Sequence, residues 1–245
     1  MPQIPTLIGL HGYPRSGKDT LAKCLAEFNY QRFAFADELR ATLLRVDPAL
    51  SGPRLSEIVS EKGWDHAESS AFGPKIRAMR DSMKQVAIHL GTPDADTRAC
   101  LLALDPAMEG ASLKNLIHDI GWEEAKDYPV HGDEVRGLMQ RWGSEVGRAQ
   151  IGTNVWVDIV ERSIAESTCE FAVITDVRFP QEAAWVRSQG VLWQITRPGF
   201  GAVNAHSSEK PLDPSLIDRQ IDNDGTYEDL VTTCRCAMGA VGLPV

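Results

Sequence analysis

Short apolar runs alternate with segments of helical spacing at both ends of the chain. Strand-like runs cover residues 4–10, 30–35, 171–175 and 191–196, with a weaker one at 220–221. Apolar positions recur at helical spacing over residues 20–28, 37–46, 180–189 and 226–236. Strands separated by helices indicate parallel strands with helices on both faces. The pattern therefore predicts an α/β fold, a three-layer αβα arrangement around a five-stranded parallel sheet.

Residues 39–150 differ, because they show helical spacing and almost no strand signal. They also contain an internal repeat: a segment at 40–52 returns at 98–110, and Gly63-Trp64 returns at the same interval as Gly121-Trp122. Two unrelated amphipathic helices could look alike by chance, but shared turn residues and a shared Gly-Trp pair disfavour that reading. The repeated segments read Arg40-Ala41-x-Leu43-Leu44-x-x-Asp47-Pro48-Ala49-x-x-Gly52 and Arg98-Ala99-x-Leu101-Leu102-x-x-Asp105-Pro106-Ala107-x-x-Gly110.

The domain organisation follows from these two patterns. We expect a core formed by residues 1–38 and 151–245, with a lid-like segment at about 197–212. Residues 39–150 form an inserted, internally duplicated helical region on the substrate side, with copies at about 39–77 and 97–136. Two copies of this length are too few for a solenoid.

Composition and charge narrow the class of protein. The 245 residues are 43% hydrophobic, which suffices for one sizeable core with an appended subdomain, and the net charge is −9. This acidic balance argues against nucleic-acid or membrane binding. The N-terminus shows no basic leader and no long apolar stretch. With no C-x-x-C pair, the five cysteines read as reduced thiols, so we expect a cytoplasmic protein; monomer and homodimer both stay open.

The first strand-like run leads into a glycine-rich turn with the spacing of a P-loop. Gly12, Gly17 and Lys18 stand between a strand and a helix, where backbone N–H groups, the helix N-terminus and a lysine can converge on a triphosphate. The competing reading is a glycine-rich turn with an incidental lysine. The candidate ATP-binding residues of the turn are Gly12, Arg15, Ser16, Gly17, Lys18, Asp19 and Thr20.

One position departs from the standard motif. Asp19 follows the lysine directly, where Ser or Thr would hold Mg²⁺, and Thr20 comes next. Either Thr20 is the displaced metal ligand, or water and substrate oxygens hold most of the magnesium shell.

Asp176 ends the third strand, as a carboxylate of the Walker-B type does, and Arg178 follows two residues later. The alternative is a strand-end aspartate that caps a turn. Ligands of parallel sheets bind beyond the carboxyl ends of the strands, where we expect Asp37, Asp176 and Arg178 to lie. We assign Lys18, Asp176 and Arg178 as catalytic, and Thr20 and Asp176 as candidate Mg²⁺ ligands.

Arginines gather at Arg136, Arg141 and Arg148. Arg136 and Gln140 are four residues apart on an expected helix and share a face, so one can grip a phosphate while the other reads a base edge. Spacing alone favours the alternative, a solvated helix with ordinary surface charges.

A set of motifs that occur in order along the chain favours the phosphate-binding interpretation instead. Together the motifs resemble a phage-type deoxynucleoside monophosphate kinase, related to the adenylate kinase group, over nearly the whole chain. The motifs are Gly12-x4-Gly17-Lys18-Asp19-Thr20, Phe35-Ala36-Asp37-Glu38-Leu39-Arg40, Gly121-Trp122-Glu123-Glu124-Ala125-Lys126, Val135-Arg136-x-Leu138-Met139-Gln140-x-x-Gly143-x-Glu145-x-x-Arg148, Trp156, Asp176-x-Arg178-Phe179, Arg197-Pro198-Gly199, His206-Ser207-Ser208-Glu209 and Asp222-Asn223-Asp224-Gly225-Thr226.

The resemblance implies transfer of the ATP γ-phosphate to a deoxynucleoside monophosphate with Mg²⁺, in the host cytoplasm if the chain is phage-encoded. By position it places Arg197 and Asn223 with ATP. The implied substrate pocket comprises Asp37, Arg40, Arg136, Gln140, Arg148, Trp156 and His206. The duplication departs from the family pattern, since Asp81 stands where the first copy would need the counterpart of Gln140.

Two other functions stay open. The chain could phosphorylate another small acceptor of the dephospho-coenzyme A or phosphomevalonate type, or bind nucleotide without turnover.

Overall fold

The structure is a computed structural model that describes residues 6–201, 211–240 and 242. Its contacts divide the chain into two compact units, which we name by their content. The P-loop unit comprises residues up to 36 and from 159 onwards, and the helical unit comprises residues 37–158. The divisions fall within α2 (Phe35–Val46) and α8 (Val155–Glu166).

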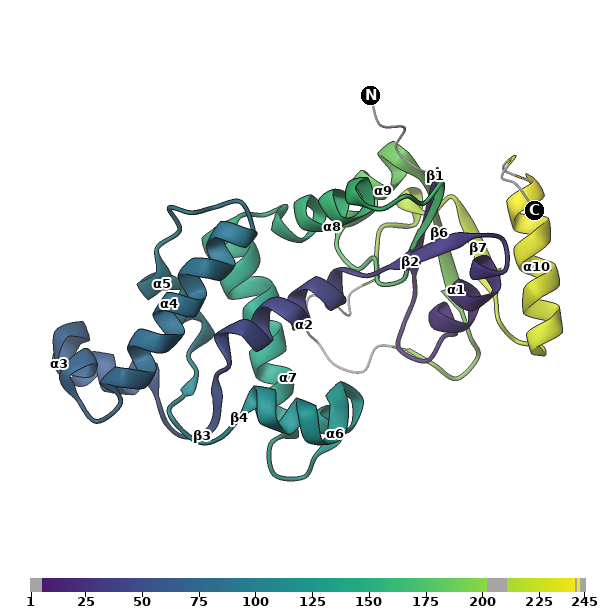
Figure 1. Cartoon of the computed structure of the whole chain (residues 1–245). Helices are drawn as coiled ribbons and strands as arrows, with labels where there is room; N and C mark the ends of the chain where they lie inside the picture. The colour runs from purple at the N-terminus through teal and green to yellow at the C-terminus, as the bar shows by residue number, and fades with distance from the viewer. Residues whose placement is uncertain (1–5, 202–210, 241, 243–245) are drawn as a thin grey trace. The chain divides into compact units, whose positions relative to one another are not determined.

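The P-loop unit contains a five-stranded parallel sheet in the order β2-β5-β1-β6-β7 (Figure 1). The predicted α/β class and parallel sheet are therefore confirmed. The strands are β1 (Thr6–His11), β2 (Tyr30–Phe33), β5 (Phe171–Ile174), β6 (Gly190–Thr196) and β7 (Arg219–Asp222). The remaining elements of this unit are α1 (Lys18–Ala26), the end of α8, α9 (Pro180–Gln189), η3 (Pro214–Leu216) and α10 (Tyr227–Ala240).

Alternate residues of the central strand face two helical layers. Ile8 and Leu10 are fully buried in a cluster with residues of α1 and α10. Gly9, which points to the opposite face, leaves room for α9: an added Cβ would lie 2.6 Å from Val186 Cγ1. The period-two alternation of β1 thus separates the layers and gives the three-layer arrangement.

The second helix begins two residues earlier than its sequence predicts. We expected a strand to residue 35 and a helix from Asp37, but β2 ends at Phe33 and α2 begins at Phe35. The carboxylate of Asp176 caps the helix from the end of β5, so the signal for its start does not lie in the local sequence. By contrast, α10 is capped locally, since Thr226 Oγ1 accepts a hydrogen bond from Asp229 N.

The helical unit contains a small sheet that the sequence did not predict. β3 and β4 pair antiparallel, in a region where the sequence shows almost no strand signal. Besides β3 (Ala49–Arg54), β4 (Glu109–Ser112) and parts of α2 and α8, the unit contains α3 (Leu55–Ser69), α4 (Gly73–His89), α5 (Thr97–Leu104), α6 (Leu113–Asp127), α7 (Gly132–Arg141) and the π-helix η1 (Trp142–Ile151).

The two repeated segments make matching contacts with each other. Asp47 Oδ1 accepts a hydrogen bond from Lys114 N, and Asp105 Oδ1 accepts one from Ser56 N, each over 2.9 Å. Leu113 N donates to Pro48 O, and Leu55 N donates to Pro106 O. The donors and acceptors of each pair of bonds stand at equivalent positions of the repeat. The first part of each copy therefore packs on the second part of the other, in an exchanged arrangement around β3 and β4.

The helix that follows each strand bends at the same place in both copies. Gly63 has φ 80° and ψ 172°, and Gly121 has φ 76° and ψ 168°. These left-handed φ values favour glycine, which explains why the repeat keeps this residue before its tryptophan.

All five cysteines are free thiols, and burial raises the pKa of Cys100 to about 11 and that of Cys234 to about 12. Both thiols are therefore protonated at neutral pH and poor nucleophiles. Within residues 6–201 and 211–240, no helix has the length and apolarity needed to cross a bilayer.

Candidate functional site

The turn between β1 and α1 forms a cradle of backbone groups. Lys18 Nζ donates hydrogen bonds to Gly12 O and Tyr13 O, both at 2.7 Å, so the ammonium lies over the turn. Gly17 has φ 106°, and an added Cβ would lie 2.3 Å from Asn223 Nδ2. That amide donates to Ser16 O over 2.9 Å and braces the turn. Glycine is thus required at position 17 by both conformation and space.

Ser16 leaves a donor unused inside this cradle. Its residue is 2% exposed, and its Oγ has no hydrogen-bond partner among the described residues. Buried hydroxyl groups are nearly always paired, so a partner is expected from a ligand or from water. The positive end of α1 lies at the same turn, and together these groups favour an anion.

Asp176 uses both carboxylate oxygens to hold the start of α2. Oδ1 accepts from Phe35 N over 2.9 Å, and Oδ2 accepts from Ala36 N over 2.7 Å. Asp176 therefore caps the N-terminus of α2, a helix about 140 residues away in sequence, and not a turn at the end of its own strand. A carboxylate oxygen can accept more than one bond, so capping and metal binding are compatible.

The residues around Asp176 could supply only a few of the ligands of a magnesium ion. Among the described residues, no group of three or more His, Cys, Asp or Glu side chains could hold a metal. Mg²⁺ commonly uses one or two carboxylates and completes its shell with water and phosphate oxygens. Asp176 can supply such a carboxylate, and the Thr20 hydroxyl, which makes no hydrogen bond within the described residues, can supply a further oxygen.

The segment after Asp176 is fixed by two side chains that the sequence analysis missed. His11 Nδ1 donates to Val177 O over 2.9 Å, and burial lowers the pKa of His11, so the imidazole is neutral. The buried Glu182 accepts from Arg178 N over 2.8 Å and from Phe179 N over 3.0 Å. These bonds hold the backbone of Arg178 next to the end of β1. Glu182 is three residues into α9, a capping-box position that could have been read from the sequence.

The lid-like segment is described only in part. Arg197 follows directly after β6, and its Cζ lies 5.2 Å from the ring centroid of Phe200. His206 lies outside the described residues.

In the helical unit, basic side chains meet on the last turns of α6. Arg40 lies over the ring of Trp122, with 5.6 Å from Cζ to the ring centroid. Arg40 and Lys126 both bond to Glu123, over 3.0 Å and 2.6 Å, and Arg136 pairs with Asp127. We name Arg40, Trp122, Lys126 and Arg136 the Trp122 face.

The carboxylates of this face are exposed, but the cations are less so. The side chains of Glu123 and Asp127 are 76% and 72% exposed, against 25% for Arg40. Hydrogen bonding to Lys126 and attraction by Arg40 lower the pKa of Glu123, which is therefore ionised at neutral pH. Arg40 Nε is buried without a hydrogen-bond partner among the described residues. The face thus carries cations whose present partners are easily displaced by another anion.

The other predicted substrate residues lie on α2, α7, η1 and α8. Asp37 is exposed in the first turn of α2, and Gln140 follows Arg136 by one turn of α7 without a hydrogen bond to any described residue. Arg148 and the indole of Trp156 both donate to Gly143 O, over 2.7 Å and 2.9 Å. Trp156 is only 2% exposed, which suits a residue that positions η1 better than one that touches a ligand. π-helical turns often occur at functional sites.

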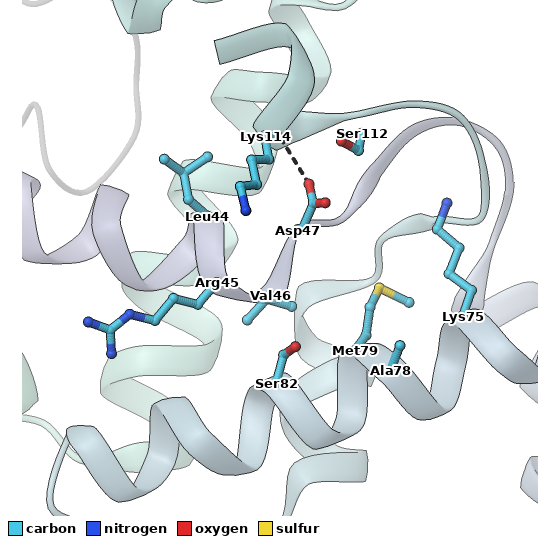
Figure 2. A pocket seen from close by; sticks show the side chains of 10 residues that line it. All are labelled: Leu44, Arg45, Val46, Asp47, Lys75, Ala78, Met79, Ser82, Ser112 and Lys114. Carbon is cyan, nitrogen blue, oxygen red and sulfur yellow. Dashed lines mark hydrogen bonds between the residues drawn. The ribbon is translucent and has the colours of Figure 1, made fainter. Parts of the chain in front are cut away.

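A cavity of about 510 Å³ opens elsewhere in the helical unit, between the end of α2, α4 and the start of α6 (Figure 2). None of the predicted site residues lines it. Lys75, Ser82 and Ser112 lie in its wall, whereas the equivalent positions in the other copy hold Glu134, Arg141 and Arg54. Arg141 and Arg54 are larger than the two serines and both pair with Glu134, so the cavity lies where the equivalent ion-pair network is missing.

Two comparisons with known proteins bear on this geometry. Residues 107–234 match the family described as deoxynucleotide monophosphate kinase. The chain is 30% identical over 199 residues to the deoxynucleoside-5'-monophosphate kinase of Escherichia phage T5, covering 75% of this chain and 72% of the phage protein. The matched segment includes the Trp122 face apart from Arg40, and also Asp176 and Asn223. By these matches, the chain belongs to the deoxynucleotide monophosphate kinase family.

Proposed function

We propose that this chain transfers the γ-phosphoryl group of ATP to a deoxynucleoside monophosphate, giving a deoxynucleoside diphosphate and ADP. The observation that carries the proposal is the cradle at residues 12–18, where the buried Ser16 hydroxyl has no partner among the described residues and the Lys18 ammonium lies over the turn. The kinship with the phage T5 kinase supports the choice of acceptor. Because both substrates are free nucleotides, we place the activity in the cytoplasm, that of the host if the chain is phage-encoded.

The P-loop unit supplies the donor site in this proposal. Phosphate oxygens replace the loop carbonyls as partners of Lys18, and Ser16 Oγ gains its missing acceptor. When bound, Mg²⁺ would be held by Thr20 and Asp176 and would neutralise phosphate charge. Arg178, whose backbone Glu182 fixes, adds positive charge near the transferred group. No strong general base is needed, because the acceptor phosphate is already ionised.

The Trp122 face supplies the acceptor site. Arg136 and Arg40 bind the phosphate of the monophosphate once it displaces the exposed carboxylates of Asp127 and Glu123. Gln140 lies one helical turn from Arg136 and has a free amide, which suits reading of a base edge. Arg148 is positioned by its bond to Gly143 O.

The proposal is tested with ATP labelled in its γ-phosphate. The enzyme is incubated with Mg²⁺ and with each deoxynucleoside monophosphate, and separately with dephospho-coenzyme A and phosphomevalonate. We expect label in at least one deoxynucleoside diphosphate and in neither other product. Label only in another acceptor would assign a different kinase activity. ATP binding without transfer to any acceptor would indicate a nucleotide-binding module.

A further inference from the structure

A second cluster of arginines surrounds a tryptophan in the helical unit. Arg98 lies over the ring of Trp64, with 5.3 Å from Cζ to the ring centroid. Arg80 and Arg98 both bond to one carboxylate oxygen of Glu68, over 2.5 Å and 3.2 Å. Arg77 donates to the backbone carbonyl of the same residue. We name Trp64, Glu68, Arg77, Arg80 and Arg98 the Trp64 cluster.

The cluster is the internal counterpart of the Trp122 face. Arg98 and Trp64 stand at the positions of the repeat that Arg40 and Trp122 occupy in the other copy. Arg77 corresponds to Arg136 after one inserted residue. In both places an arginine from the first part of one copy lies over the tryptophan of the other copy. The exchanged packing of the two copies therefore builds the same arrangement twice.

The two arrangements differ in how their cations are neutralised. The position of Lys126 is taken by Glu68, and that of Met139 by Arg80. The Glu68 side chain is only 17% exposed, whereas Glu123 and Asp127 on the Trp122 face are 76% and 72% exposed. A shielded carboxylate shared by two guanidinium groups is held much more firmly than an exposed one. Glu68 thus stands where an external oxyanion would bind.

We propose that the Trp64 cluster is a second oxyanion site, equivalent to the Trp122 face, which Glu68 keeps closed with its own carboxylate. The ligand class is a phosphate or phosphate monoester, because a guanidinium group pairs with phosphate oxygens as it does with the carboxylate that now occupies the cluster. The equivalence rests on the proposed function of the Trp122 face. The inference that the Glu68 carboxylate occupies this site rests only on the contacts of Glu68 with the arginines. One consequence is that the natural chain binds a single monophosphate in spite of its duplication.

The test removes the carboxylate and supplies an external anion. Melting temperatures of the wild type and Glu68→Gln are measured with and without inorganic phosphate, with saturating ADP throughout and with chloride matching the ionic strength. We expect Glu68→Gln to melt lower than the wild type without phosphate, because Arg80 and Arg98 lose their partner. Phosphate at about ten times its dissociation constant should then raise its melting temperature by about 3–6 °C more than that of the wild type.

Two controls isolate the site. Asp65→Asn makes the same charge change on the same helix, at a carboxylate without an ion pair within the described residues, and should respond to phosphate as the wild type does. Arg98→Gln added to Glu68→Gln should abolish the extra response. If Glu68→Gln does not fold, Glu68→Asp keeps the charge but shortens the side chain and should show an intermediate response.

Equal phosphate responses in the wild type and in the folded Glu68 variants would overturn the proposal. The readout is stability and not turnover, so a wrong assignment of the acceptor would appear in the labelled-ATP experiment and leave this result unchanged.

Discussion

The P-loop unit and the helical unit hold their charged groups in different ways. In the P-loop unit, backbone groups form the cradle, and the surrounding side chains brace it: Asn223 holds Ser16 O, and Glu182 holds the amides after Asp176. In the helical unit, the Trp122 face consists of long side chains that pair with exposed carboxylates.

This difference separates two strategies for binding phosphate. A backbone cradle is organised before the ligand arrives and loses little entropy on binding. An arginine face must exchange internal partners for the ligand, so its affinity is a difference between two sets of ion pairs. Substitutions should therefore have large effects in the first region and graded effects in the second.

The largest effect is expected for Lys18→Ala. The ammonium lies directly over the turn, so kcat should fall about 10³-fold, which corresponds to about 4 kcal/mol of transition-state stabilisation. The measurement is ADP release at saturating monophosphate. Lys23→Ala, an exposed lysine on the same helix, is the matched control and should keep wild-type turnover. Similar losses in both variants would show that the cradle does not act through Lys18.

The next largest effect is expected for Asp176, because it both caps α2 and can bind metal. Asp176→Ala removes both acceptors and should cost about 1–2 kcal/mol of unfolding free energy and about 100-fold in kcat/KM. Asp176→Asn keeps one acceptor and should cost about half as much stability. Urea unfolding and ADP release measure the two effects. Wild-type stability in both variants would refute the capping role, and Asp224→Ala controls for loss of an exposed carboxylate from the same unit.

A smaller effect is expected for Glu123→Gln, and it should be a gain in apparent affinity for the substrate and not a loss of activity. Removing this carboxylate frees Arg40 and Lys126 for the substrate, so the KM for the monophosphate should fall about two- to threefold while the KM for ATP stays constant. Glu124→Gln neutralises the neighbouring exposed carboxylate, which has no ion pair within the described residues. A KM that rises in Glu123→Gln alone would mean that the carboxylate helps to bind the substrate.

The smallest effect is expected in the pH dependence of stability. Because burial lowers the pKa of His11 below its ordinary value of 6.5, the folded state favours the neutral imidazole. Its contribution is present above pH 6.5 and is lost as the pH falls through the folded-state pKa. His11→Asn, which can still donate to Val177 O, should therefore lose less stability than the wild type between about pH 7.5 and about pH 5.5.

Urea unfolding at the two pH values measures this difference. His118→Gln removes an imidazole whose side chain is 87% exposed and should leave the pH dependence unchanged. Parallel curves for the wild type and His11→Asn would contradict the account of His11.

What the sequence could predict depends on how local the causes are. The P-loop is a contiguous strand, turn and helix, and α9 begins with Pro180 and ends before Gly190, so both could be recognised from neighbouring residues. The β3–β4 pair was missed because its strands contain Gly52, Pro53 and Gly110, which read as turns, and because the two strands belong to different copies of the repeat.

The candidate site, like the fold, could be predicted where its causes are local in the sequence. The residues of the cradle follow from spacing alone, whereas the cap that Asp176 provides to α2 joins residues about 140 positions apart. The partners of Arg40 and Arg98 depend on the exchanged packing of the copies, which the repeat indicates but does not specify. The roles of His11 and Glu182 require the neighbours that folding brings to them.

The central claim is that the cradle and the Trp122 face bind different phosphates. Calorimetric titration of a deoxynucleoside monophosphate into the wild type, Arg136→Gln and Lys18→Ala tests it most directly. We expect Arg136→Gln to raise the dissociation constant at least about tenfold and Lys18→Ala to change it less than about twofold. An unchanged dissociation constant in Arg136→Gln, with a tenfold increase in Lys18→Ala, would contradict it.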